Sequence, residues 1–89
     1  MPDWRVEFDR DAARDLRKLD VQAQCLILRY LRERIAADAD PRRFGHALTG
    51  GLKGLWRYRV GDYRIVTAIE DDRFVVLVVT VGRRREVYG

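Results

Sequence analysis

Three arginines between Leu55 and Arg64 are the side chains of this sequence best suited to chemistry. Arg57, Arg59 and Arg64 alternate with apolar and aromatic residues at a period of two, and Gly61-Asp62 interrupts the pattern where a tight hairpin turn would lie. In such a hairpin the three guanidinium groups crowd one face of a sheet. Because like charges opposite each other are destabilising, the arrangement favours an anion nearby, either an internal carboxylate or a bound phosphate.

More arginines follow near the C-terminal end, and together they indicate phosphate binding. A meander of three strand segments would bring six of them side by side: Arg57, Arg59, Arg64, Arg83, Arg84 and Arg85. The guanidinium fork matches phosphate oxygens in pairs, and an exposed tyrosine could stack on a base. Trp56, Tyr58 and Tyr63 alternate with the arginines, so they would lie on the opposite face of the sheet and are expected in the core. Tyr88, in the tail, is therefore the candidate for stacking or catalysis.

The same side chains are compatible with cleavage of RNA without a metal ion. The sequence shows no Ser-His-Asp or Cys-His pattern, no glycine-rich phosphate loop and no cluster of metal ligands. Attack of a ribose 2′-hydroxyl on the adjacent phosphate is accelerated by positive groups that hold the strand in line and stabilise the developing charge. Arginine stays protonated and is a poor general base. His46 is interpreted as a surface or packing residue of a loop.

Composition bounds the class of protein. We expect residues 1–89 to form one domain. A charged fraction of 36%, a net charge of +4 and a pI near 9.7 favour an acidic partner such as nucleic acid, an acidic protein or an anionic surface. A solvated basic face, neutralised by Glu70, Glu86 or other acids, stays open as the alternative. The single Cys25 is expected as a buried thiol, and neither a signal peptide nor a membrane span is visible, so we expect a cytoplasmic protein.

Hydrophobic periodicity predicts the elements of the first half. A short strand is expected from Trp4 to Phe8, followed by a helix over 10–19 that is capped by Asp9. A second helix, capped by Asp20, is predicted from Val21 to about Ala37. Its apolar stripe is expected to contain Val21, Cys25, Leu28, Leu31 and Ile35. The two helices should form an antiparallel hairpin on a sheet, and 41–53 is interpreted as an ordered loop.

The second half supplies the sheet. After the arginine hairpin, the unbroken apolar run from Phe74 to Val81 predicts an interior strand. If Asp71 and Asp72 form the turn before it, Arg64 pairs with Val79. The arginine face then also carries three apolar residues that suit a docking partner: Val75, Leu77 and Val79. The expected fold class is α+β, with an N-terminal strand, a helical hairpin and an antiparallel β-meander that leaves room for a short extra C-terminal strand.

Over nearly its whole length the sequence resembles the RelE/ParE toxin superfamily of bacterial and archaeal toxin–antitoxin modules. The segments that carry the resemblance are 12–19, 52–64 and 81–88, of which the middle one is the most specific. Similarity to RelE implies a βααβββ fold and a ribosome-dependent endoribonuclease that needs no cofactor and cuts mRNA in the ribosomal A site. It also implies a cognate RelB-like antitoxin that blocks the toxin, operator DNA bound only through the antitoxin complex, and no membrane partner.

The resemblance also implies roles for single residues. Arg64 matches the family arginine that stabilises the transition state, Arg84 the one that assists the leaving group, and Tyr88 the tail tyrosine that stacks on or activates the substrate. Arg57 and Arg59 stand where RelE has phosphate-binding lysines, so the charge is kept and a general-base role is weakened. Three further residues are expected to bind phosphate: Lys53, Arg83 and Arg85. The antitoxin is expected to cover Val75, Leu77 and Val79 together with the arginines.

Two alternatives remain within the same fold. ParE members inhibit DNA gyrase and generally lack this catalytic set. The joint presence of Arg64, Arg84 and Tyr88 therefore favours the ribonuclease over the gyrase inhibitor. A non-catalytic module that binds nucleic acid or protein is the third possibility, and in that case Arg64→Ala would leave growth inhibition or binding nearly unchanged.

Overall fold

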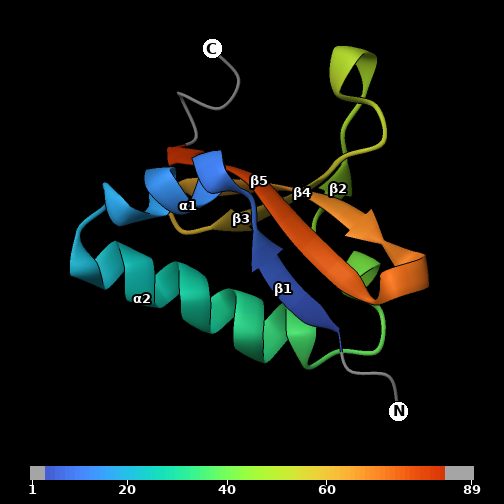
Figure 1. Ribbon diagram of the computed structural model, residues 1–89, viewed down its shortest axis with the longest axis horizontal. Coiled ribbons are helices and arrows are strands. Elements are labelled where there is room, and N and C mark those ends of the chain that lie inside the picture. The colour runs from blue at the N-terminus through green and yellow to red at the C-terminus, as the bar shows by residue number, and fades with distance from the viewer. Residues whose placement is uncertain (1–3, 84–89) are drawn as a thin grey trace.

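A helical layer covers one face of a five-stranded sheet in the computed structural model, which describes residues 4–83 (Figure 1). The helices are α1 (Arg10–Arg17) and α2 (Val21–Tyr30), and α2 continues as a π-helical segment, Leu31–Ala36. The strands are β1 (Arg5–Phe8), β2 (His46–Ala47), β3 (Trp56–Val60), β4 (Tyr63–Glu70) and β5 (Val75–Arg83). The predicted α+β class and the order of strand, helical pair and meander are confirmed.

Both helices begin at an aspartate cap, as the sequence predicts. The backbone N–H of Ala12 donates to Asp9 Oδ1 at 2.8 Å, and that of Ala23 donates to Asp20 Oδ1 at 2.7 Å. Each carboxylate thus satisfies an N–H group that has no partner inside the helix. Since Asp20 follows α1 almost directly, the two helices are joined by a tight turn and lie next to each other (Figure 1).

The buried face of α2 differs from the predicted stripe. Its buried residues are Ala23, Ile27, Leu31 and Ile35. Cys25 is exposed, so the prediction of a buried thiol is wrong. The reason is that apolar residues run consecutively through 25–28, which allows more than one helical stripe, and packing on the sheet selects the one that contains Ile27. Val21 and Leu28 are left 73% and 39% exposed, which gives α2 an apolar outer face.

The sheet has the order β1-β5-β4-β3-β2, with β1 parallel to β5 and the other pairs antiparallel. β5 is therefore an interior strand, as its apolar run predicts. The hairpin of β3 and β4 has the predicted register, with Val60 opposite Tyr63 and Arg59 opposite Arg64. Gly61, at φ 58°, supplies the left-handed conformation that this two-residue turn requires.

Two details of the meander correct the sequence prediction. The turn before β5 is a 3-10 turn, Asp71–Arg73, and a bulge lies between Val66 and Thr67. Together they place Arg64 opposite Gly82 instead of Val79. An additional strand, β2, pairs with the start of β3 inside the segment predicted as a loop. The short extra C-terminal strand of the prediction would lie beyond Arg83. Residues 84–89 lie outside the described part of the chain.

The core lies between the helices and the face of the sheet that carries the apolar and aromatic residues of the arginine hairpin. Tyr58 and Ile65, opposite each other on β3 and β4, are completely buried there. Trp56 and Tyr63 are half-buried and pack against this cluster. Successive side chains of a strand point to opposite faces of the sheet. Because the aromatic residues of this hairpin point into the core, the arginines between them point to the other face.

Gly45 marks the closest approach of the backbone to the sheet and gives a first test of the fold. Its φ is +80°, and a Cβ atom there would lie 2.2 Å from the carbonyl oxygen of Arg57. We expect Gly45→Ala to lower the free energy of unfolding by about 2–3 kcal/mol, because left-handed strain and overpacking act together. At Gly51 a Cβ meets nothing within 4 Å. The matched Gly51→Ala should change stability by less than about 0.5 kcal/mol. Urea unfolding measures both, and equal losses would contradict the packing described.

Candidate functional site

The three hairpin arginines lie on the face of the sheet that points away from the helices. Arg59 and Arg64 are directly opposite each other on β3 and β4, and Arg57 lies two residues along β3 on the same face. Arg59 is exposed, Arg57 and Arg64 are half-buried, and the Nε atom of Arg64 is buried. The placement of the three arginines on one face, predicted from the sequence, is present. We call Arg57, Arg59 and Arg64 the arginine face.

Glu70, named from the sequence as a counter-ion for the basic face, forms an ion pair with Arg73. Glu70 Oε1 accepts a hydrogen bond of 2.7 Å from Arg73, which also lies 3.7 Å from Glu7. Asp71 accepts two hydrogen bonds, of 2.8 and 2.9 Å, from the guanidinium group of Arg42. These bonds hold the pKa of Asp71 below its usual range. Glu70 and Asp71 are therefore engaged with arginines outside the hairpin.

Two of the other predicted phosphate-binding residues, Lys53 and Arg83, lie apart from the arginine face. Lys53 is exposed in the loop between β2 and β3, which projects beyond the sheet (Figure 1). Arg83 is opposite Tyr63, so it shares the face of the helices at the end of β5. The remaining three candidates lie outside the described residues: Arg84, Arg85 and Tyr88. The structure thus brings together three of the predicted arginines and leaves the tail untested.

The apolar residues expected beside the arginines offer less surface than the sequence suggests. Val75 and Leu77 do share the arginine face, through their pairing with Glu70 and Ala68 on β4. Val75, however, is completely buried, and Leu77 is half-buried. Val79 is the residue skipped at the bulge and is also half-buried. A broad exposed apolar patch at this place is therefore not observed.

A cavity of about 290 Å³ next to the arginines is the feature that sequence reasoning missed. Six residues line it: Tyr30, Phe44, Gly45, His46, Arg57 and Arg59. We call it the His46 groove. His46 is exposed and lies directly opposite Arg57 in the pairing of β2 with β3. A strand of two residues carries no periodicity, so only the glycine before His46 signals the close packing of this segment.

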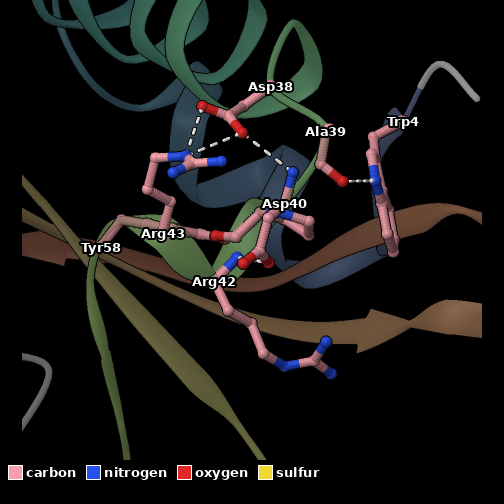
Figure 2. A network of polar contacts seen from close by, with 8 residues as sticks. Trp4, Asp38, Ala39, Asp40, Arg42, Arg43 and Tyr58 are labelled. Carbon is pink, nitrogen blue, oxygen red and sulfur yellow. Dashed lines mark hydrogen bonds and ion pairs between the residues drawn. The ribbon is translucent and has the colours of Figure 1, made fainter. Parts of the chain in front are cut away.

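Hydrogen bonds hold in place the segment that follows α2 and leads to the lining of the His46 groove. Figure 2 shows Asp38 bridging two groups: its carboxylate accepts from Arg43 Nε at 3.0 Å and from the backbone N–H of Asp40 at 2.9 Å. These bonds hold the pKa of Asp38 below its usual range. Trp4 donates its indole N–H to the carbonyl oxygen of Ala39 at 3.0 Å, which ties the segment to the start of the chain.

Two aromatic side chains of β3 anchor the same segment from the sheet. Trp56 Nε1 donates to the carbonyl oxygen of Phe44 at 2.7 Å, and the hydroxyl of Tyr58 donates to that of Pro41 at 2.6 Å. Burial raises the pKa of Tyr58 well above its usual value, so its phenol stays protonated and acts as a structural donor. The wall of the His46 groove is thus held rigidly against β3.

A second cavity, of about 340 Å³, lies on the other side of the sheet. It is lined mostly by apolar residues of β1, α2 and the π-helical segment: Val6, Phe8, Leu28, Leu31, Arg32 and Ala36. We call it the α2 groove. Leu28, one of the exposed apolar residues of α2, stands at its rim, so the groove continues into the apolar outer face of the helix.

Two kinds of feature are absent from residues 4–83. No helix in this range is long and apolar enough to cross a membrane. No three histidine, cysteine or acidic side chains of the range come close enough together to bind a metal ion.

Comparison with known sequences gives concordant matches over nearly the full chain. Residues 6–88 match the family model described as the ParE toxin of the type II toxin–antitoxin system parDE. Toxin RelE of Mycobacterium tuberculosis is 32% identical over 85 residues, which cover 96% of this chain and 86% of that protein. Toxin RelG of the same organism is 28% identical over 85 residues, covering 96% and 95%.

Solved structures agree with the sequence matches. The toxin–antitoxin complex RelBE2 of Mycobacterium tuberculosis contains a chain with a TM-score of 0.85 and 28% identity, with 97% of each chain covered. The isolated RelE toxin of Escherichia coli gives a TM-score of 0.70 at 26% identity, covering 96% of this chain and 90% of that one. The matched regions include the arginine hairpin.

Proposed function

This chain belongs to the RelE/ParE family of toxins from type II toxin–antitoxin systems, and we propose that it is a ribosome-dependent endoribonuclease that cleaves mRNA in the A site. The observation that carries the proposal is the arginine face, where the register of β3 and β4 places three arginines on one side of a hairpin. Planar guanidinium forks on one face match the oxygens of successive phosphates. The curated relatives named RelE and RelG support the ribonuclease branch of the family.

The proposed reaction divides the work among these arginines. The ribose 2′-oxygen attacks the adjacent phosphorus, and the bond to the 5′-oxygen of the next nucleotide breaks. Arg57 and Arg59 hold the phosphates in line, and Arg64, partly withdrawn from water, stabilises the negative charge that grows on the phosphate in the transition state. Arg84 is proposed to assist the leaving oxygen and Tyr88 to stack on a base.

An antitoxin is the second proposed partner. A toxin 28% identical to this chain was solved as part of a toxin–antitoxin complex. We propose that one antitoxin segment covers the arginine face with Leu77 and Val79 at its border. A second, amphipathic segment would occupy the α2 groove, where Leu28 is exposed and needs an apolar cover.

The direct test is translation in a purified system on a defined mRNA, followed by primer extension. We expect new 5′ ends within A-site codons in reactions that contain toxin and ribosomes, and none when the ribosomes are omitted. An mRNA that stays intact while translation continues at its normal rate would refute the ribonuclease proposal.

Inhibition of DNA gyrase is the second candidate, because the matching family model is described by the name ParE. In that case the arginine face would dock on an acidic protein surface and no RNA would be cut. A supercoiling assay with purified gyrase separates the two functions, since a ribonuclease leaves plasmid supercoiling unchanged.

Salt dependence gives a prediction that follows from the arginines alone. Each phosphate neutralised on a single strand contributes about −0.7 to the slope of log K against log salt concentration, so three arginines predict a slope of roughly −2. Fluorescence anisotropy with a labelled oligoribonucleotide measures it. Arg59→Ala should bring the slope closer to zero by about 0.7, while Arg17→Ala, an exposed arginine of α1, should leave it unchanged. A flat dependence for the unmodified toxin would point to a protein target.

A further inference from the structure

The His46 groove is lined by the two kinds of residue that suit binding of single-stranded RNA. Its lining contains three aromatic residues, Tyr30, Phe44 and His46, and two arginines, Arg57 and Arg59. A nucleotide has the same two parts, a flat base and a phosphate, at a separation of a few ångströms. Its base can stack on an aromatic ring while the phosphate accepts hydrogen bonds from an arginine fork.

The rings reach the groove from separate parts of the chain. Tyr30 comes from the end of α2, where its ring centroid lies 6.2 Å from that of Tyr58. Phe44 and His46 flank Gly45, whose lack of a Cβ lets the segment lie against the carbonyl oxygen of Arg57. The aromatic side is thus fixed by a buried tyrosine and by a glycine-dependent contact. A preorganised wall of this kind loses little freedom when a ligand binds.

Size and position restrict what the groove can hold. A volume of about 290 Å³ is near the lower limit of ligand pockets, which are typically ~300–1,000 Å³, so it suits one nucleotide and not a folded RNA element. Since Arg57 and Arg59 belong both to the groove and to the arginine face, a nucleotide in the groove continues directly to a phosphate near Arg64.

We propose that the His46 groove binds one ribonucleotide of the unpaired mRNA strand, its base against Tyr30, Phe44 and His46 and its phosphate on Arg57 and Arg59. The inference rests on the proposed ribonuclease function and adds to it a base-binding subsite beside the cleavage position. It also gives His46 a role as a stacking side chain, whereas the sequence alone indicates a surface or packing residue.

The test compares two small probes on the isolated toxin, adenosine monophosphate and ribose 5-phosphate, by nuclear magnetic resonance titration. The first probe has both a base and a phosphate, and the second has only the sugar phosphate. We expect adenosine monophosphate to bind at least roughly fivefold more tightly, because only its base can stack on the rings. Equal affinities for the two probes would overturn the proposal.

Variants assign the two halves of the groove. His46→Ala should weaken binding of adenosine monophosphate roughly fivefold and leave binding of ribose 5-phosphate unchanged. His46→Phe should restore the difference in affinity between the two probes. Arg59→Ala should weaken binding of both probes, and Arg17→Ala should affect the binding of neither. Because His46 is exposed on an edge strand, its replacement should not affect folding, which thermal unfolding checks. If His46→Ala binds both probes like the unmodified toxin, the base does not lie in this groove.

Two outcomes separate this inference from the function on which it rests. Nucleotide binding that depends on His46, in a toxin that leaves mRNA intact on ribosomes, would keep the subsite and refute the nuclease. Cleavage of mRNA that is indifferent to His46→Ala, with no preference for the base-bearing probe, would keep the nuclease and refute the subsite. A glutamate-rich peptide that binds the groove in place of the nucleotide would show that it serves a protein partner.

Discussion

Replacement of Arg64 by alanine is expected to reduce ribosome-dependent cleavage of mRNA by roughly a hundredfold or more, because a preorganised positive group at the reacting phosphate is lost. The Nε atom of Arg64 is buried, so its guanidinium group is partly withdrawn from water and acts at reduced dielectric. The effect should appear in the single-turnover rate, measured with saturating toxin on stalled ribosomes, more than in binding.

Matched variants make the prediction for Arg64 specific. Arg64→Lys keeps the charge without the planar fork and should lie between the unmodified toxin and Arg64→Ala. Arg17→Ala removes the same charge from an exposed position of α1 and should cleave normally. A cleavage rate for Arg64→Ala within about threefold of the unmodified toxin would remove Arg64 from the reaction, provided that thermal unfolding shows both proteins folded.

Replacement of Leu28 by glutamate is expected to weaken binding of the antitoxin by roughly thirtyfold or more, since a charge would enter the apolar centre of an interface. Leu28 is 39% exposed and lines the α2 groove, so the glutamate can reach solvent in the free toxin and should not unfold it. The groove lies on the helical side of the sheet, away from the arginine face. The Leu28→Glu toxin should therefore cleave mRNA at the normal rate, and the antitoxin should no longer neutralise it.

Val21→Glu is the control for Leu28→Glu, because it makes the same change on the same helix. Val21 is 73% exposed, does not line the α2 groove and stands at the N-terminus of α2, where a carboxylate is tolerated. Calorimetric titration with the cognate antitoxin should show a change of less than about threefold. Equal affinities of the Leu28→Glu variant and the unmodified toxin would place the antitoxin elsewhere.

Local patterns of the sequence are sufficient for the elements that are stabilised locally. The aspartate caps at Asp9 and Asp20 are predicted because the capping carboxylate and the helix it serves are adjacent in sequence. The arginine hairpin is predicted because a two-residue turn at Gly61 fixes the register of both strands. The position of three guanidinium groups on one face follows from that register and from the period of two along each strand.

Features that depend on distant parts of the chain are not visible in the sequence. The bulge near Val66 shifts the register of β4 against β5, and nothing in the local pattern of either strand signals it. The buried stripe of α2 is chosen by the sheet, so Cys25 turns outward. His46 gains its neighbours only because Gly45 lets a short segment pair with β3, and for this reason the groove could not be predicted.

The most direct measurement places the unmodified toxin, at equal concentrations, in two parallel reactions: translation of a defined mRNA, and supercoiling of a plasmid by gyrase. We predict mRNA cut at discrete A-site codons only when ribosomes are present, together with normal supercoiling. Intact mRNA together with blocked supercoiling would contradict the ribonuclease proposal and identify gyrase as the target.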